Sequence, residues 1–389
     1  MRILGIETSA DDTGVALIEA DGTFGADFNF KVLGNAVASQ SVHASYGGIF
    51  PAIAKREHAK NLVPTLEKVL REAKALEAGA ASNVAHVREL LVREPEIFEH
   101  LDAFLKKYDP PEVDAIAVTV GPGLEPCLWT GINLARVLAD VWDVPVVGVN
   151  HMEGHLIMSM MEIRSPSSGA MMNFDYPALA LLVSGGHTEL ILMKALGEYQ
   201  YIGRTRDDAA GEAFDKIARM LELPYPGGPA IARLAAEARE KNLPSDIKLP
   251  RPMLNEDNFD FSFSGLKTAV LRLLESDWQG KTLPLEIKAE IAREVEDTIT
   301  EVLVEKTVHA AEEYGVSAVI MSGGVSANSH IRSELTARLQ AASCQMLVCP
   351  PEFSTDNGLM IALSGYFYAL NKEFAEPSAL TANGQLKLG

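Results

Sequence analysis

The sequence predicts an α/β fold made of two related halves. The first observation is that two apolar segments, residues 2–6 and 14–18, are joined by a short polar turn and have the pattern of paired strands. The second is that the same layout recurs at residues 178–183 and 189–193, where the connecting turn contains glycine. In both halves, short apolar strand patterns then alternate with amphipathic helix patterns, which is typical of α/β chains.

The remaining elements follow from hydrophobic periodicity. Further strands are expected at residues 115–120, 144–149, 318–321 and 345–349. Helices are expected at residues 53–73, 131–141, 151–162, 209–221, 287–314, 329–341 and 357–371. Three regions do not fit this alternation, namely a helical insertion at about 75–109, a loop at residues 164–174 and a loosely ordered tail after Pro377.

Length and charge limit the class of protein. The 389 residues, 47% of them hydrophobic, suffice for two domains with separate cores. We expect one lobe at residues 1–150 with 357–389, and a second at 151–356. The net charge of −19 argues against a surface that binds nucleic acid as a whole. Two short basic segments, residues 55–60 and 204–206, are either local contacts for nucleic acid or ordinary solvated faces.

Three further features predict a cytoplasmic protein. There is no run of about 18 apolar residues, the length that a membrane-spanning helix needs. The first residues lead directly into a strand pattern without the architecture of a signal peptide. The three cysteines, Cys127, Cys344 and Cys349, form no C-x-x-C pair and are too few for a disulfide framework, as expected in a reducing compartment.

Three glycine-rich turns predict a nucleotide site. They are residues 183–187, 223–229 and 321–328, and the last of them leads into a helix. Glycine lets backbone amides approach a phosphate closely and permits the positive φ angles of an anion nest. A single Gly-Gly turn is usually only a turn, but two Ser-Gly-Gly turns after apolar strands favour phosphate binding. Because neither Walker A nor G-x-G-x-x-G is present, we expect a phosphate clamp between two lobes.

Asp215 is a candidate ligand of the nucleotide sugar. It lies one turn along the helix expected at residues 209–221, soon after the segment at 204–208. A carboxylate in this position could accept hydrogen bonds from both ribose hydroxyls. The alternative is an exposed helix residue that pairs with Lys216 or Arg219. The pattern of residues does not choose between the two.

A pair of histidines predicts a metal site. His151 and His155 follow the strand expected at residues 144–149 and lie four residues apart, so both imidazoles share one face of the next helix. The junction of strand and helix is also where ligands bind in α/β proteins. A third ligand should be a carboxylate or another histidine. Asp356 is a candidate, although it would also serve as the N-cap of the last helix.

The same pair raises the possibility of a zinc peptidase, whose motif is H-E-x-x-H. Here Glu153 lies two residues from each histidine, which is about 200° of helix rotation and directs it away from the ion. We therefore interpret Glu153 as the residue that answers the N-cap Asn150 in a capping-box arrangement. A metal-dependent peptidase is disfavoured.

Taken in order, these motifs resemble those of the tRNA N6-adenosine threonylcarbamoyltransferase family, also called TsaD and formerly labelled a glycoprotease. The matching segments are residues 5–9, 46–48, 121–124, 150–155, 182–188, 211–216, 261–267, 322–328 and 354–357. They span nearly the whole chain apart from the insertion and the tail. The resemblance implies the actin/Hsp70/sugar-kinase (ASKHA) type of fold, with two RNase H-like lobes and a nucleotide cleft between them.

The resemblance also implies an activity. A threonylcarbamoyl group would pass from threonylcarbamoyl-AMP to N6 of the adenosine beside the anticodon, in tRNAs that read ANN codons. His151, His155 and Asp356 would hold one divalent metal ion, with Fe²⁺ favoured and Zn²⁺ the alternative. ATP or threonylcarbamoyl-AMP would be the nucleotide ligand. Its contacts are expected from Leu182, Val183, Ser184, Gly185, Gly186, Asp215, Gly228 and Asn328.

The implied partners are tRNA and the accessory proteins of this modification system. These are a paralogous ASKHA protein, a P-loop ATPase and the threonylcarbamoyl-AMP synthase, and no membrane is involved. The sequence departs from the family pattern at Ala10, where a cysteine is usual, and at Ala52, where a glutamate is usual. Asp11 is retained, and we expect it to help deprotonate the attacking amine.

Two other functions remain open on the residues alone. A small-molecule kinase or ATPase of the same fold would transfer a phosphoryl group and would have no use for the histidine pair. A nucleotide-dependent scaffold would use the metal only structurally.

Overall fold

The computed structural model describes the chain except for residues 26, 41, 44–47, 80–86, 93, 166, 245, 279–280 and 389. Most of the motif at residues 46–48 and part of the insertion therefore lie outside the described residues. Contacts divide the chain into two compact units, Met1–Asn173 with Thr355–Leu388 (unit 1) and Phe174–Ser354 (unit 2). The sequence placed the first division at residue 150, whereas the contacts place it after Asn173.

Unit 1 is built on a seven-stranded sheet of order β5-β4-β1-β2-β3-β7-β6. Its strands are β1 (Arg2–Glu7), β2 (Asp12–Asp21), β3 (Asn29–Ser39), β4 (Ala115–Gly121), β5 (Val146–Asn150), β6 (Met161–Ser165) and β7 (Ser168–Met171). The β1–β4 and β4–β5 pairs are parallel, and the other pairs are antiparallel.

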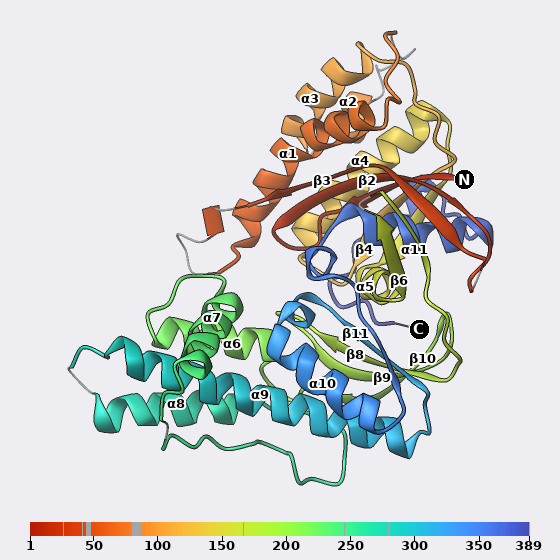
Figure 1. The fold of residues 1–389 in the computed structure, drawn as a ribbon. Helices are drawn as coiled ribbons and strands as arrows, with labels where there is room; N and C mark the ends of the chain where they lie inside the picture. Colours follow the sequence, from red (N-terminus) through yellow and green to blue (C-terminus); the bar gives the residue numbers. More distant parts are fainter. Residues whose placement is uncertain are drawn as a thin grey trace. The chain divides into compact units, whose positions relative to one another are not determined.

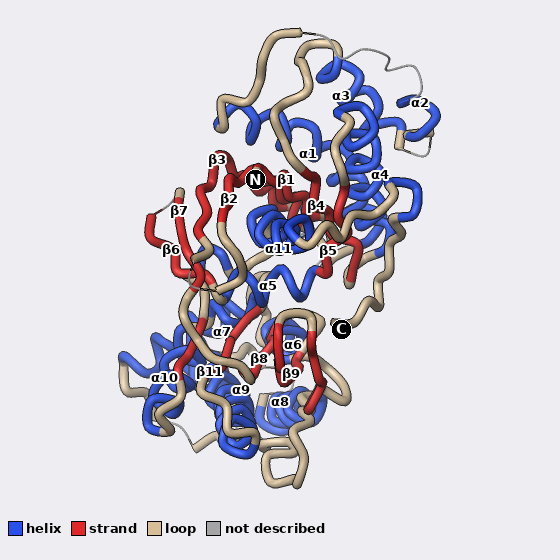
Figure 2. The backbone as a smooth tube through the Cα atoms, turned by 90° about the vertical axis from the view of Figure 1, so that its right-hand side faces the viewer, coloured by secondary structure: helices blue, strands red, loops and turns tan. Residues whose placement is uncertain are grey.

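Helices cover both faces of this sheet, as the buried strand residues require (Figures 1 and 2). The helices α1 (Pro51–Glu72) and α4 (Glu125–Trp142) pack on one face, and α11 (Gly358–Leu370) packs on the other. The helix α5 (His151–Ser159) follows β5 directly and packs against α11. In the expected insertion, α2 (Val87–Leu90) precedes α3 (Pro95–Leu105), which packs on α1.

Unit 2 is built on a five-stranded sheet of order β10-β9-β8-β11-β12. Its strands are β8 (Ala178–Val183), β9 (Thr188–Ala195), β10 (Glu198–Arg204), β11 (Ala318–Ser322) and β12 (Gln345–Leu347). Its α-helices are α6 (Ala210–Met220), α7 (Gly227–Glu240), α8 (Ser264–Asp277), α9 (Leu285–Glu313) and α10 (Ser329–Ala341). Leu179 and Leu181 of β8 share one hydrophobic core with residues of α6, α7 and α9.

The two sheets repeat one strand order. In unit 1, β5-β4-β1-β2-β3 has parallel pairs on one side of β1 and antiparallel pairs on the other. In unit 2, β12-β11-β8-β9-β10 has the same pairing around β8. The prediction of an α/β chain with two related halves is therefore confirmed.

The segment at residues 164–174 is not the expected loop. The strands β6 and β7 form an antiparallel hairpin there, and β7 pairs with β3 at the edge of the sheet of unit 1. The helix expected at residues 151–162 ends at Ser159 because the chain enters β6 at Met161. The strands β3 and β10 were not predicted, because exposed and half-buried residues interrupt their apolar pattern. The helix α8 was not predicted either, although Leu266, Val270 and Leu273 have helical spacing.

The tail after Pro377 was expected to be loosely ordered, and that expectation is wrong. A short 3-10 helix, η4 (Pro377–Ala379), is followed by Leu380, which is buried. The backbone N–H of Asn383 donates to the carbonyl of Val120 at 2.8 Å. The Arg136 guanidinium donates to the carbonyl of Leu380. Tertiary contacts that a local pattern cannot reveal therefore hold this segment on unit 1.

In the described part of the chain, no helix combines the length and apolar character needed to cross a bilayer. The three cysteines are buried and are not joined by disulfide bonds. Burial raises the pKa of the Cys127 thiol to about 12. The Cys127 thiol is therefore a poor nucleophile at neutral pH, because the thiolate is the reactive form.

The start of α11 lies unusually close to the first two strands. A Cβ atom added to Gly358 would lie 2.5 Å from the backbone nitrogen of Ala16, and one added to Gly14 would lie 2.5 Å from the nitrogen of Gly358. One added to Gly5 would lie 2.3 Å from the carbonyl oxygen of Gly358. These three glycines let backbone pack on backbone, and thereby fix where the segment before α11 lies.

We expect Gly358→Ala to lower the free energy of unfolding of unit 1 by about 1–3 kcal/mol, because the new methyl group has no space. Urea unfolding monitored by circular dichroism measures this change. Gly48→Ala is the matched control, since a Cβ there would meet nothing within 4 Å. Equal stability of the two variants would contradict the close packing of α11.

Candidate functional site

The helix α5 begins at a strand end, and its cap fixes where the two histidines lie. Asn150 is the last residue of β5, and its side-chain oxygen accepts hydrogen bonds from the backbone N–H groups of Met152 and Glu153. This is the predicted N-cap, which satisfies amides that have no partner within the helix. His151 and His155 therefore occupy successive turns on one face of α5.

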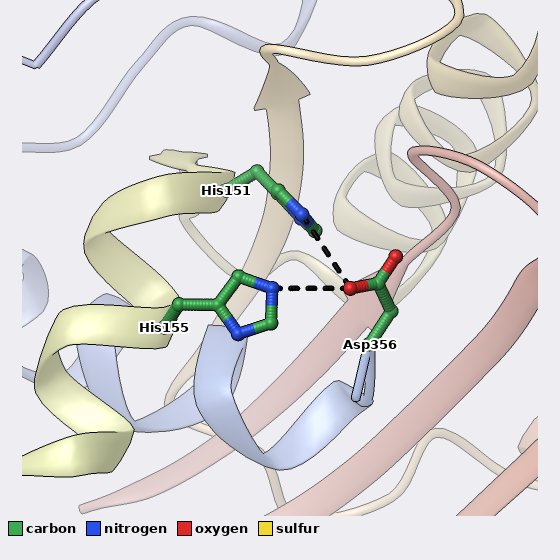
Figure 3. A group of neighbouring side chains, drawn as sticks. All are labelled: His151, His155 and Asp356. Atoms are coloured by element: carbon green, nitrogen blue, oxygen red, sulfur yellow. Dashed lines mark hydrogen bonds and ion pairs between the residues drawn. The ribbon is translucent and has the colours of Figure 1, made fainter. Parts of the chain in front are cut away.

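Asp356 completes a group of three metal-ligating side chains with these histidines (Figure 3). Its Oδ1 atom lies 3.0 Å from Nε2 of His155 and 3.5 Å from Nε2 of His151. The donor atoms of the three residues all lie within 4.8 Å of one another. The N-cap of α11 is Asn357, which accepts the N–H of Met360, so Asp356 does not serve as that cap.

Glu7 is a site residue that the sequence reading missed, because it was taken as part of a polar turn. Its side chain is fully buried at the end of β1. Its Oε2 atom lies 3.0 Å from Nδ1 of His151 and accepts a hydrogen bond from the Thr119 hydroxyl. Its Oε1 atom accepts the N–H of Ser9. A carboxylate directly after a strand of buried apolar residues was the available signal.

Buried charges of opposite sign stabilise this group. Burial by itself would lower the pKa of His151, but the charges of Glu7 and Asp356 and the hydrogen bond to Glu7 raise it to about 9. Burial by itself would raise the pKa of Asp356 and of Glu7, but His151 lowers both. In the metal-free protein, the proton on His151 provides the positive charge that stabilises the two carboxylates. A bound metal cation would provide a larger positive charge at the same place.

Two more carboxylates lie near this group, Asp12 at the start of β2 and Asp11 just before it, in the turn after β1. Asp11 is half-buried there, and its carbonyl accepts the N–H of Gln40. Burial raises the pKa of Asp12 to about 7, opposed by a hydrogen bond from Ser39 and reinforced by the charges of Asp356, Asp11 and Glu7. The sequence reading singled out Asp11 and missed Asp12. A carboxyl group that titrates near neutrality is suited to proton transfer.

A buried histidine of α1 holds this turn in place. The Nε2 atom of His58 lies 3.0 Å from the carbonyl oxygen of Ala10, and its Nδ1 atom lies 2.8 Å from the hydroxyl of Thr13. Burial lowers the pKa of His58, so the ring is neutral at pH 7. Nε2–H then donates to Ala10, and Nδ1 accepts from Thr13.

The glycine turns all lie in unit 2 and differ in what their glycines do. Gly323 has a φ of +88°, and a Cβ there would lie 2.5 Å from the carbonyl oxygen of Val183, so the backbone itself requires glycine. At Gly185 and Gly186, φ is not positive, and an added Cβ would meet nothing within 4 Å. The expected positive φ angles are therefore absent from that turn, and its two glycines leave open space instead.

The first of these turns is held by its own serine. Ser184 Oγ accepts hydrogen bonds from the N–H groups of Gly186 and His187. The side chains of Leu182 and Val183 are buried in the sheet, so a ligand could reach only their backbone. The side of the turn at Gly185 and Gly186 is the part that remains open.

Asp215 and Asn328 both have structural partners. Asp215 Oδ1 accepts the N–H of Gly227 at 2.7 Å, at the start of α7. Burial raises the pKa of Asp215, while hydrogen bonds from Gly227 and Gly228 oppose the rise. Asn328 caps α10 by accepting the N–H of Ile331 and donates to Glu296. Neither alternative considered for Asp215 included this contact with α7.

The residues of the two basic segments are partly neutralised. Lys55 Nζ lies 2.9 Å from Glu94, and Arg206 Nε lies 2.9 Å from Asp260. Within the first segment, Lys60 lies 3.8 Å from Glu57. Paired cations of this kind add little attraction for a polyanion.

Glu153 is buried, and its Oε2 atom accepts hydrogen bonds from the Tyr368 and Ser364 hydroxyls of α11. Burial and the charge of Glu153 raise the pKa of Tyr368. The glutamate thus links α5 to α11, a role that a peptidase base would not have.

Comparison with known proteins identifies close relatives. The family model for tRNA N6-adenosine threonylcarbamoyltransferase matches residues 31–85 and 96–363. A protein of that name from Ralstonia pickettii (strain 12J) is 40% identical over 367 residues, covering 94% of this chain and 90% of the relative. Another of that name, from Persephonella marina (strain DSM 14350 / EX-H1), is 38% identical over 370 residues, with the same coverage of 94% and 90%.

A solved structure supports the fold. Full-length HypF in its phosphate- and nucleotide-bound form is similar with a TM-score of 0.50 and 13% identity. The match covers 93% of this chain and 45% of HypF, so the chain spans less than half of that protein. At this identity the likeness concerns the fold alone, and it agrees with the expected ASKHA type with two RNase H-like lobes.

The pKa of His151 predicts how metal affinity depends on pH. Because a metal ion must displace the proton that His151 carries below about pH 9, Zn²⁺ affinity should rise about tenfold per pH unit between pH 7 and 8.5. Competition with a chromophoric chelator measures it. In the metal-free protein, the stabilisation from protonated His151 is complete below its ordinary pKa of 6.5 and is lost as pH rises through about 9. An affinity independent of pH would contradict a protonated His151.

Proposed function

The chain belongs to the tRNA N6-adenosine threonylcarbamoyltransferase family, and from this premise we propose its reaction and ligands. It transfers the threonylcarbamoyl group of threonylcarbamoyl-AMP to N6 of the adenosine beside the anticodon, in tRNAs that read ANN codons. The products are the modified adenosine, t6A, and AMP. The observation that carries the proposal is the convergence of His151, His155 and Asp356 in a protein of this family.

The same observation disfavours the alternatives. A small-molecule kinase of this fold has no use for two imidazoles and a carboxylate at one point. A zinc peptidase of the H-E-x-x-H type needs the glutamate of that helix beside the metal, whereas Glu153 accepts hydrogen bonds from Tyr368 and Ser364 of α11.

The chemistry of the donor set favours one divalent ion per chain, with iron ahead of zinc. Two histidines and one carboxylate that leave other positions open are typical of non-haem Fe²⁺ sites, and zinc also accepts these ligands. When bound, the ion would supply Lewis-acid stabilisation of charge on the carbamoyl oxygen. Elemental analysis of anaerobically purified protein decides between the two ions.

The transfer balances without a further reactant. A bond forms between N6 of adenosine and the carbamoyl carbon, the bond from that carbon to the phosphate oxygen breaks, and AMP departs. N6 loses one proton as its new bond forms. Asp11 is our predicted acceptor of this proton, and Asp12, the first residue of β2, with a pKa of about 7, is the second candidate.

For the nucleotide, we propose that threonylcarbamoyl-AMP or ATP contacts the open side of the turn at Leu182–Gly186. Support comes from the space beside Gly185 and Gly186, which the fold itself does not need. Gly228 is similarly open, with the nearest atom 4.0 Å from an added Cβ. Asp215 and Asn328 stay predicted contacts. Each already has a protein partner, so each would have to serve a ligand with its remaining hydrogen-bonding capacity.

We propose tRNA as substrate, and as partners a paralogous ASKHA protein, a P-loop ATPase and the threonylcarbamoyl-AMP synthase. The net charge of −19 supports the proposal that this chain and its partners bind tRNA together. Lys55, Lys60 and Arg206 of the two basic segments are each paired with an acidic residue, which reduces the positive charge that these segments can offer. Part of the affinity for a polyanion would then come from the partners.

The test of function is a transfer assay. We incubate the chain and the accessory proteins with tRNA transcript, threonine, bicarbonate and ATP, and detect modified adenosine by mass spectrometry. Loss of a metal ligand in His151→Ala should lower transfer at least about 100-fold, since charge on the carbamoyl oxygen loses its stabilisation, while AMP binding persists. His309→Ala, at an exposed histidine of α9, is the control. Full transfer by metal-stripped His151→Ala would exclude the metal role.

The nucleotide proposal predicts a contrast between two glycines. Gly185→Ala should leave stability within about 0.5 kcal/mol of the parent, because its Cβ meets no protein atom. It should nevertheless weaken AMP binding about tenfold or more, because the methyl group enters space meant for the ligand. Gly323→Ala should instead lower stability, owing to its φ of +88°. Calorimetry measures both properties, and unchanged AMP affinity of Gly185→Ala would refute the assignment of this turn.

A further inference from the structure

Glu7 is hydrogen-bonded to His151, one of the three candidate metal ligands. We infer that Glu7 is a positioning residue for His151, which it holds with Nε2 directed at the point where the metal ligands meet. The inference rests on the metal component of the proposed function. It concerns metal binding, and its test does not depend on transfer of the threonylcarbamoyl group.

The first argument is that the two nitrogens of the His151 ring have different partners. Nδ1 lies 3.0 Å from Oε2 of Glu7, and Nε2 lies 3.5 Å from Oδ1 of Asp356. The same Asp356 oxygen lies 3.0 Å from Nε2 of His155. Because an ionised carboxylate only accepts, Nδ1 must carry the hydrogen that is shared with Glu7. The lone pair of a singly protonated ring is then on Nε2, on the side of Asp356 and His155.

The second argument is that Glu7 itself is held on both oxygens. Ser9 N–H donates to Oε1 and the Thr119 hydroxyl donates to Oε2, each at 2.5 Å. Thr119 lies on β4, the strand that pairs in parallel with β1. The carboxylate is fully buried, so no water competes for these contacts. A carboxylate fixed in this way can fix the ring of His151 in turn.

A carboxylate bound to the far nitrogen of a metal-ligating histidine sets the tautomer and orientation of the ring and strengthens it as a ligand. Loss of such a partner typically costs about 10–100-fold in metal affinity. Glu7 would therefore act on the metal through His151, without being a ligand itself.

The test measures Zn²⁺ affinity of the full-length chain by competition with a chromophoric chelator. Glu7→Gln keeps the size of the side chain but removes its charge, and should weaken Zn²⁺ binding about 10–100-fold. The matched control is Glu94→Gln, at a second buried glutamate of unit 1, which pairs with Lys55. It should bind Zn²⁺ within about twofold of the parent. Parent-like affinity of a folded Glu7→Gln protein would overturn the inference.

A double-mutant cycle separates positioning from a general structural effect. In a His151→Ala background, Glu7→Gln should cause no further loss of Zn²⁺ affinity, because the residue through which Glu7 acts is gone. An equal loss in both backgrounds would overturn the inference. The visible spectrum of bound Co²⁺ should change with Glu7→Gln in the parent and stay the same in the His151→Ala background.

A milder variant covers the case in which Glu7→Gln does not fold. Thr119→Val removes one hydrogen bond to Glu7 and keeps the size of the side chain. It should weaken Zn²⁺ binding several-fold, and unchanged affinity would again overturn the inference. If transfer of the threonylcarbamoyl group were never observed, the Zn²⁺ results would still stand. If Glu7 proved irrelevant, the proposed function would be unaffected.

Discussion

The packing of α11 directly on β1 and β2 is the contact on which the metal group depends. Gly5, Gly14 and Gly358 remove the side chains that would separate helix from sheet. Because α11 also packs on α5, this contact brings Asp356 to a pair of histidines some two hundred residues earlier in the chain. No sequence spacing encodes such a meeting. It results from three positions at which any larger residue would be excluded by the backbone opposite.

Around this contact, unit 1 buries several acidic groups that would repel one another without a cation. Glu7, Asp12 and Asp356 act on each other's charge, and His151 is the basic group that lowers the pKa of two of them. Burying carboxylates is costly unless they are paired or bound to metal. Their concentration around Asp356 therefore indicates a site organised for positive charge. The hydrogen bonds from Thr119 and Ser9 to Glu7 give that site a fixed geometry.

The features that depend on residues near one another in the sequence were predicted correctly. The paired strands, the two related halves and the Asn150 cap follow from periodicity and capping chemistry, and the structure has all of them. The missed features depend on distant partners. Glu7 was interpreted as a turn residue because its contacts with Thr119 and His151 are not visible in the sequence. Neither interpretation of Asp215 included its contact with the start of α7. The β6–β7 hairpin likewise takes its stability from the edge of β3.

The turn that carries Asp11 is held through its backbone, since His58 bonds to the carbonyl of Ala10 and not to a side chain at that position. Its shape is therefore independent of which side chain residue 10 bears. With alanine there, in place of the cysteine usual in the family, the turn contains no sulfur to oxidise or alkylate. The three thiols of the chain are buried, and burial together with the charge of Asp11 raises the pKa of Cys127. Reagents that oxidise or alkylate thiols therefore have no target in this turn.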